Sequence, residues 1–398
     1  MRATTGADFD EFQRVAAAAF LDEWVEREKW SRQAFETHRF HAAFDADELV
    51  GTCGILGRRL TLPGAGPVPV AAVTAVTVKP GHRRRGVLTG MMRAQLHGLR
   101  DEGAEATAAL WASEATIYGR FGYGCAAHHL AVDIPAEQPF RPDVELGADR
   151  VRQLPRDTAI PLIAARYGPV AARRPGWLDR DELAWNLRLL DIEERRYGSS
   201  ALRFAVHPEG YAVFRTRRGW DDRGPDGRIQ VEEIVAGTPT AAAALWRYLL
   251  DYDLVGAVRA EVALDDPITR MLVDPRQAVA RFSDSLWIRL VDVDRALALR
   301  GYAAPIDVVL ELTDTFCPWN AGRLRLAAPV DAPATVRRTT DPADLALDVA
   351  DLGAVFLGGP TLAQLADAGR VRERTPGALV PASRAFAGDR PPFCPEIF

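Results

Sequence analysis

The chain has 398 residues, 48% hydrophobic and 26% charged, a composition typical of a folded protein with two or three domains. Its net charge of −5 and isoelectric point near 5.9 argue against a nucleic-acid partner and suit a cationic one. The sequence lacks an apolar run as long as a membrane span and a secretory signal pattern at its start, so we expect a cytoplasmic protein without a membrane partner.

The first region of the chain alternates helix and strand patterns. Apolar residues recur at helical spacing in two segments, whereas β-branched, small and alternating residues mark four strands. The expected helices cover 8–20 and 87–102, and the expected strands cover 39–46, 49–62, 70–78 and 104–111. The strand 70–78, the loop after it, the helix 87–102 and the strand 104–111 form a βαβ unit.

A proline-rich stretch at 135–155 leads to a middle region with a fainter copy of this order. The strand 229–235, the helix 238–252 and the strand 258–264 repeat the βαβ unit, which indicates a duplicated and diverged fold. A basic, glycine-containing loop is missing between this strand and helix, so we expect no cofactor in the middle region.

The third region has an α+β order rather than a further βαβ repeat. Its strand and helix patterns do not alternate regularly along the chain. Strands are expected over 285–291, 306–313 and 322–326, and helices over 292–301, 342–349 and 361–368.

The four cysteines are scattered and carry neither a CxxC pair nor a ligand spacing typical of zinc. We therefore expect free thiols in a reducing compartment and no bound metal. They are Cys53, Cys125, Cys317 and Cys394.

The segment 76–90 carries the most informative pattern, because a strand ends, a basic loop turns and a helix begins at Gly86. The free N–H groups and the dipole at a helix start favour a pyrophosphate, and a glycine lets it approach closely. Arg83, Arg84 and Arg85 add charge for nearby phosphates. The alternative is a solvated basic turn, but the position between a buried strand and a helix favours the phosphate loop.

The run Arg83-Arg84-Arg85-Gly86-Val87-Leu88 resembles the acetyl-CoA loop of the GNAT N-acetyltransferases: Gln or Arg, two variable residues, Gly, a variable residue, then Gly or Ala. The chain differs at the last position, where Leu88 stands. The resemblance implies that acetyl-CoA is the acyl donor and that a strand backbone contacts its pantetheine. The expected cofactor contacts are Val76, Val78, Arg83, Arg84, Arg85, Gly86, Val87, Leu88, Thr89 and Ser113.

Together with the segment 112–124, the loop also resembles the enhanced intracellular survival (Eis) family. This resemblance implies an α/β (α+β) fold with a GNAT domain over 1–135, a degenerate GNAT-like domain over 150–284 and a sterol-carrier-protein-like domain over 285–398. It also implies a homohexamer that acetylates primary amines of aminoglycosides or lysine side chains; a polyamine is a further candidate acceptor.

Acetyl transfer requires a deprotonated amine, donors for the developing oxyanion and an acid for the leaving thiolate. The backbone N–H of Val78 is the expected oxyanion donor. Tyr118 and Tyr123 are equivalent candidate acids from the residues alone, and the resemblance assigns the role to Tyr118. We expect Tyr118 on a helix over 113–121 with Ser113 as its N-cap.

The chain ends in an apolar, proline-stiffened segment, 391–398, that is typical of a tail entering a pocket rather than a loose terminus. The resemblance assigns the general base to the carboxylate of Phe398. His82 lies on the phosphate side of the loop, and a structural role is expected for His128 and His129 on their strand.

Acidic and aromatic residues crowd one helical region near the N-terminus and suit a cationic amine through charge and cation–π contact. A solvated helix docked by its tryptophans explains the pattern equally well. The expected acceptor contacts are Asp22, Glu23, Trp24, Glu26, Trp30 and, on the tail, Glu396. Two other classes stay open: a catalytically silent GNAT-fold protein whose C-terminal domain binds a lipid or small ligand, and a regulatory scaffold.

Overall fold

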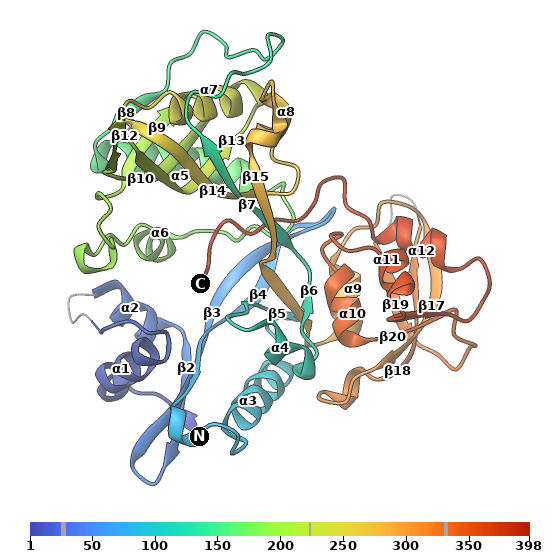
Figure 1. Ribbon diagram of the computed structural model, residues 1–398. Helices are drawn as coiled ribbons and strands as arrows, with labels where there is room; N and C mark the ends of the chain where they lie inside the picture. Colours follow the sequence, from blue (N-terminus) through green and yellow to red (C-terminus); the bar gives the residue numbers. More distant parts are fainter. Residues whose placement is uncertain (25–28, 223, 330–332) are drawn as a thin grey trace.

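The computed structural model describes residues 1–24, 29–222, 224–329 and 333–398. Its larger sheets are two of seven strands and one of five, as the predicted α/β and α+β regions require (Figure 1). No helix within these ranges is both long and apolar enough to cross a membrane.

The first sheet has the order β1-β2-β3-β4-β5-β16-β6 and carries helices on both faces. Alternate residues of β2 face opposite sides: Ala42 packs with Phe12 of α1, whereas Ala43 packs with Met91 of α3. Its strands are β1 (Arg2–Ala3), β2 (Arg39–Asp45), β3 (Glu48–Leu62), β4 (Gly66–Val78), β5 (Thr107–Trp111), β6 (Gly124–Cys125) and β16 (Leu286–Leu290), and its helices are α1 (Phe9–Ala19), α2 (Lys29–Thr37), α3 (Val87–Glu102) and α4 (Ala115–Tyr118).

The second sheet has the order β15-β7-β14-β13-β10-β9-β8 and confirms the predicted second βαβ unit, because β13 and β14 are parallel with α7 between them. Its strands are β7 (His128–Pro135), β8 (Arg152–Leu154), β9 (Arg203–His207), β10 (Gly210–Arg217), β13 (Gly227–Ala236), β14 (Val255–Ala263) and β15 (Val279–Asp284), beside a separate hairpin of β11 (Trp220–Asp221) and β12 (Gly224–Pro225). Its helices are α5 (Arg156–Ala171), α6 (Glu182–Arg188), α7 (Pro239–Leu250) and α8 (Ile268–Met271).

The third sheet, in the order β19-β18-β17-β20-β21, forms the C-terminal α+β domain with helices packed into a common core. Its strands are β17 (Ile306–Thr313), β18 (Gly322–Ala328), β19 (Thr335–Arg338), β20 (Leu345–Asp348) and β21 (Val371–Glu373), and its helices are α9 (Val293–Leu299), α10 (Val349–Val355), α11 (Leu362–Asp367) and α12 (Leu379–Phe386).

Two sequence predictions are corrected by the sheet pairing. The segment 285–291, expected to open the third region, contains β16 of the first sheet, which pairs antiparallel with β5. Likewise β7, at the end of the expected first domain, lies in the second sheet. The sequence pattern of a strand is the same whichever sheet the strand joins, so local pattern could not place either segment. The helix expected over 342–349 is instead the short strand β20 followed by α10.

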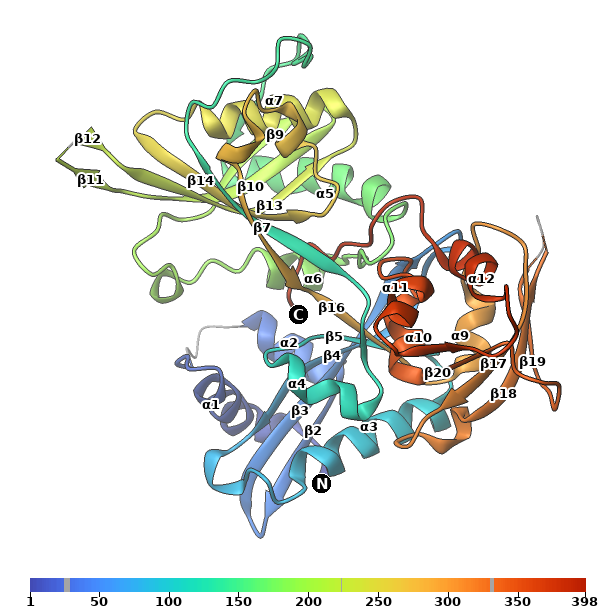
Figure 2. The same cartoon turned by 45° about the vertical axis from the view of Figure 1, so that its right-hand side comes forward.

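The C-terminal tail leaves the third domain after α12 and returns to the first two sheets (Figures 1 and 2). Arg174 donates a hydrogen bond to the carbonyl of Pro391 at 2.8 Å, and the backbone N–H of Phe393 donates to the carbonyl of Pro175 at 3.0 Å. Both views place the chain end between the first and second domains. The last residues are therefore held by parts of the molecule remote in sequence.

Candidate active site

The two parallel strands of the first sheet separate toward their carboxyl ends. β4 and β5 are paired at Ala71–Ala108 and Ala72–Ala109. Further along β4, Ala75 adopts φ +50° and the register against β3 shifts, as in a β-bulge. The end of β4, which contains Val76 and Val78, is left without a strand partner on its β5 side within the described chain, so its backbone is available to a ligand.

The loop after β4 turns through two residues of positive φ before α3 begins. Arg84 has φ +62° and Gly86, the N-cap of α3, has φ +83°. A β-carbon placed on Gly86 would meet no atom within 4 Å, so the space in front of the helix start is open. The first N–H groups of α3, at Val87, Leu88 and Thr89, have no partners within the helix. The geometry therefore offers backbone donors and an approach path to a phosphate.

The three arginines of the loop are exposed, and they differ in their partners. Arg85 lies 3.4 Å from Asp45, which His82 also approaches at 3.3 Å. Arg83 reaches the carbonyl of Val78 at 3.5 Å. Arg84 forms no ion pair with a described residue, so its charge is free for an anionic ligand.

Leu88 stands where the family loop has Gly or Ala, and its side chain lies in the core instead of in the loop. Its side chain is half-buried and packs against the cluster that contains Ala43, Cys53 and Met91. The larger side chain thus contributes to the core below α3 rather than to the loop.

Tyr118 ends α4, beyond the last residue of β5, and is buried at 6% exposure. Burial, assisted by the nearby charge of Glu114, raises the pKa of its hydroxyl to about 12. The hydroxyl is therefore protonated near neutral pH, as a proton donor must be. Ser113 is not the N-cap of α4 as predicted: Glu114 takes that position, and no side chain caps the helix.

Tyr123 lies beside Tyr118, with ring centroids 5.9 Å apart, but is more completely enclosed. It is 1% exposed, and its buried hydroxyl has no hydrogen-bond partner in the described chain. Burial raises its pKa further than that of Tyr118, against the lowering effect of the Arg289 guanidinium. Tyr123 is consequently sealed from any acceptor, whereas Tyr118 keeps some exposure.

The tail is fixed by a buried network of charges around Glu396. One oxygen of Glu396 accepts from Arg58 of β3 at 2.7 Å and the other accepts from Arg180 at 2.7 Å. Arg180 also forms a two-point contact with Glu233 of β13 at 2.6 and 3.0 Å. Each carboxylate oxygen of Glu396 thus accepts from an arginine, so Glu396 anchors the tail; its expected contact with an acceptor amine stays a prediction.

The chain terminus lies beyond this anchor. Phe398 is half-buried and packs against the core that also contacts Trp111 at the end of β5. Ile397, by contrast, is 71% exposed and does not shield the terminus. Among the described residues, Arg58 and Arg180 pair with Glu396, and no cation forms an ion pair with the terminal carboxylate.

Of the residues expected to contact an acceptor, Asp22, Glu23 and Trp24 have partners within the protein. Asp22 forms an ion pair with Arg195 of the second domain at 2.9 Å, and Glu23 offers its carbonyl to the same arginine at 3.4 Å. Trp24 packs edge-on against Phe9, 5.4 Å between ring centroids, which supports the docking alternative for this tryptophan.

Helix α2, which begins just before the half-buried Trp30, lies near the chain end in both views (Figures 1 and 2). Glu26 falls outside the described residues. A contact of Trp30 with the acceptor stays a prediction.

The sequence did not single out Arg58, Arg180 or Glu233, which hold the tail in place. Arg58 and Glu396 are 338 positions apart, and none of these residues belongs to a local motif. Arg58 and Arg59, two adjacent arginines among the mainly apolar residues of β3, are the one signal that could have drawn attention.

A basic loop that opens a helix between two diverging parallel strands, followed by a diverged copy of the same unit, defines a tandem acetyltransferase of the GNAT fold. Residues 1–126 and 176–290 each match the model of the acetyltransferase (GNAT) domain, and residues 293–395 match that of the sterol carrier protein domain.

An uncharacterized N-acetyltransferase of Streptomyces avermitilis is 44% identical over 94% of this chain and 92% of its own. The N-acetyltransferase Eis of Mycobacterium bovis is 34% identical over 86% and 84%. The crystal structure of Eis1 from Mycobacterium abscessus superposes with a TM-score of 0.85 at 34% identity, covering 99% of this chain and 98% of that one. The chain belongs to the Eis family of GNAT N-acetyltransferases, and it is an acetyltransferase.

Proposed function

We propose that this acetyltransferase moves the acetyl group of acetyl-CoA to a primary amine of a cationic acceptor, with Tyr118 as general acid and the terminal carboxylate of Phe398 as general base. The observation that carries the proposal is the double anchor of Glu396, which holds an uncompensated carboxylate at the chain end between the first two domains. A positioned carboxylate without a cationic partner is free to take a proton from an amine.

The loop and the end of β4 fit acetyl-CoA in charge and in backbone geometry. Arg83, Arg84 and Arg85, with the open N–H groups after Gly86, would hold the phosphates, and Val76 and Val78 would offer backbone groups to the pantetheine. Ser113, exposed after β5, completes the proposed contacts. When bound, acetyl-CoA supplies the acetyl group as an activated thioester. The backbone N–H of Val78 would stabilise the developing oxyanion, and Tyr118 would return a proton to the departing sulfur.

The net charge of the chain and its membership of the Eis family support a cationic amine as the acceptor. The chain carries a net charge of −5, and Trp30 lies on α2, the helix near the chain end in Figures 1 and 2, where an aromatic ring would suit a cationic amine. An aminoglycoside, a polyamine or a lysine side chain presents the required cationic amine. We further propose a cytoplasmic homohexamer, an assembly that light scattering after size-exclusion chromatography measures directly.

Release of the CoA thiol tests this function. The native chain is incubated with acetyl-CoA and, separately, with spermidine, an aminoglycoside or a lysine-containing peptide, and the acetylated acceptor is weighed by mass spectrometry. We expect thiol release coupled to a mass gain on at least one acceptor. Acetyl-CoA binding without turnover on any amine would instead favour the catalytically silent, ligand-binding protein.

A further inference from the structure

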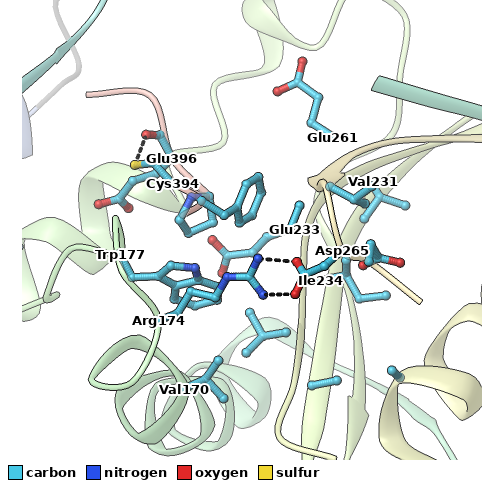
Figure 3. A pocket seen from close by; sticks show the side chains of 18 of the residues that line it. Val170, Arg174, Trp177, Val231, Glu233, Ile234, Glu261, Asp265, Cys394 and Glu396 are labelled. Carbon is cyan, nitrogen blue, oxygen red and sulfur yellow. Dashed lines mark hydrogen bonds and ion pairs between the residues drawn. The ribbon is translucent and has the colours of Figure 1, made fainter. Parts of the chain in front are cut away.

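A cavity of about 760 Å³ lies mainly in the second GNAT domain, and Trp111 of β5 in the first sheet also lines it (Figure 3). Its walls come from β13, the start of α7, the end of β14, the turn that precedes α6 and the C-terminal tail. Neither Tyr118 nor any of the proposed acetyl-CoA contacts lines it. Its volume is that of a site for a small organic molecule.

The cavity occupies the place in the second βαβ unit that the proposed acetyl-CoA contacts occupy in the first. β13 and β14 are paired as far as Val231 and Ala260, and the residues beyond these points line the cavity. The turn into α7, however, is unsuited to phosphate. Thr238 caps the helix through the N–H of Ala241 at 3.3 Å and donates to Glu209 at 2.9 Å, which places a carboxylate at the helix start.

Four of the six carboxylates around the cavity form ion pairs with arginines. Asp265 accepts from Arg174 and from Arg390, and Figure 3 marks its two contacts with Arg174. Asp266 accepts from the indole of Trp246 at 3.2 Å and from a backbone N–H. Glu232, Glu233 and Glu396 pair with Arg215, Arg180 and Arg58, respectively. Glu261 has a side chain that is 56% exposed and lies 3.9 Å from His129. At four of the six carboxylates, an amine ligand would therefore have to displace an arginine.

Four N–H donors in the cavity wall have no hydrogen-bond partner in the described chain: Nε1 of Trp111, Nε of Arg174, Nε1 of Trp177 and Nε of Arg188. Arg174 is 7% and Trp177 4% exposed, and one turn presents both, because the N–H of Trp177 donates to the carbonyl of Arg174 at 3.2 Å. Gly176 in this turn has φ +93°, and a β-carbon there would lie 2.8 Å from the carbonyl oxygen of Phe393. The turn is thus pressed against the tail and holds the donors of Arg174 and Trp177 in place.

We propose that this cavity is a second ligand site, which binds a small carboxylate with an apolar body. The carboxylate oxygens accept from Nε of Arg174 and Nε1 of Trp177, because buried donors gain most from a charged acceptor. The apolar body packs against Val231, Val235 and Phe393, which line the same space. The occupant would also contact the tail that carries the proposed catalytic base.

Calorimetric titration of the full chain tests this site without any turnover. The probes are phenylacetate, its neutral isostere phenylacetamide and the amine phenethylamine. We expect phenylacetate to bind one-to-one and the other two to bind at least about tenfold more weakly. Trp177→Phe keeps an aromatic ring and removes the N–H, and should weaken phenylacetate binding about tenfold, since a hydrogen bond to a charged group is lost. Trp185→Phe is the matched control, because Trp185 packs on Tyr167 outside the cavity wall.

Three results would overturn the proposal. They are failure of phenylacetate to bind, tighter binding of phenethylamine than of phenylacetate, and equal phenylacetate affinity in the native chain and a folded Trp177→Phe. Should Trp177→Phe not fold, Ile234→Trp fills the cavity from its half-buried wall position and must abolish binding. Phenylacetate should bind to Gly86→Val with the affinity it has for the native chain. The test of this second site is therefore independent of the test of the proposed acetyl-CoA loop.

Discussion

Tyr118 and Tyr123 show how two identical side chains in one sheet-edge segment acquire different chemistry. Both lie in the core that contains Leu110 and Phe121, and both hydroxyls are made less acidic by burial. Tyr118 keeps 6% exposure at the end of α4, whereas Tyr123 retains 1% and faces the buried guanidinium of Arg289. Access to the substrate therefore favours Tyr118 as the proton donor.

We predict that Tyr118→Phe lowers kcat by roughly 10²–10⁴-fold, the usual scale of general acid catalysis, with little change in acetyl-CoA affinity. The variant loses the hydroxyl and keeps the ring that packs against Tyr123. Steady-state kinetics on one acceptor provides the measurement. Tyr123→Phe is the control and should be milder; a larger loss in Tyr123→Phe would show that the other tyrosine is the acid.

Gly86 combines a backbone requirement with open space for a ligand. We predict that Gly86→Val raises the Kd for acetyl-CoA, because a branched side chain would occupy the approach to the helix start and strain a φ of +83°. Arg84→Ala should weaken binding through lost charge. Gly98→Ala, in the interior of α3 with no atom within 4 Å of the new carbon, should bind normally. Titration with acetyl-CoA decides, and unchanged affinity in folded Gly86→Val removes the loop assignment.

The tail behaves as an element of its own, since residues far apart in the sequence fix its course. Glu396 locks it to β3 and to Arg180, and the turn at Gly176 presses against Phe393. A terminal carboxylate held in this way has a defined position, although it belongs to no helix or strand.

We predict that a short polar extension after Phe398, or amidation of the terminus, sharply reduces turnover and leaves folding and acetyl-CoA affinity nearly unchanged. Either change removes the carboxylate at its anchored position, and the proposed base is lost with it. Phe398→Leu keeps the carboxylate and an apolar anchor and should retain much of the activity. Turnover of the three forms is compared at one pH. Full activity in a well-folded extended chain would move the base to His128, Glu114 or a relayed water.

At the scale of the whole molecule, one buried charge network joins the three domains. Arg58 comes from the first sheet, Glu233 and Arg180 from the second domain, and Glu396 from the tail of the third. Burial alone would raise the pKa of Glu233, but the guanidinium groups of Arg180 and Arg188 lower it to about 2. Removing one partner would leave a buried charge unpaired, which is strongly destabilising.

This lowered pKa gives the network a defined pH dependence. The folded pKa of Glu233 lies below its ordinary value of 4.5, so its stabilisation is complete above about pH 4.5 and is lost as the pH falls toward 2. The contribution is on the order of 3 kcal/mol. We predict that Glu233→Gln is less stable at neutral pH and loses less stability than the native chain across this window. Urea unfolding at several pH values measures the difference, with exposed Glu102→Gln as control; parallel pH curves would contradict it.

The sequence by itself determined the local elements and the loop chemistry. Helical spacing marked α3, small and β-branched residues marked the end of β4, and the glycine between them set the helix start. These features depend on residues close in the chain, where propensity and periodicity act directly. The family resemblance, confirmed by the relatives, rests on the same contiguous residues.

The tertiary structure alone decided the partners of buried segments. β16 reads as a strand in any sheet, and its place beside β5 depends on packing across the whole fold. Glu396 reads as an acidic residue near a substrate, and its role as an anchor follows from Arg58 and Arg180, which fold topology brings to it. Such contacts between distant residues leave no periodic trace in the sequence, because each partner is selected by burial and charge rather than by spacing along the chain.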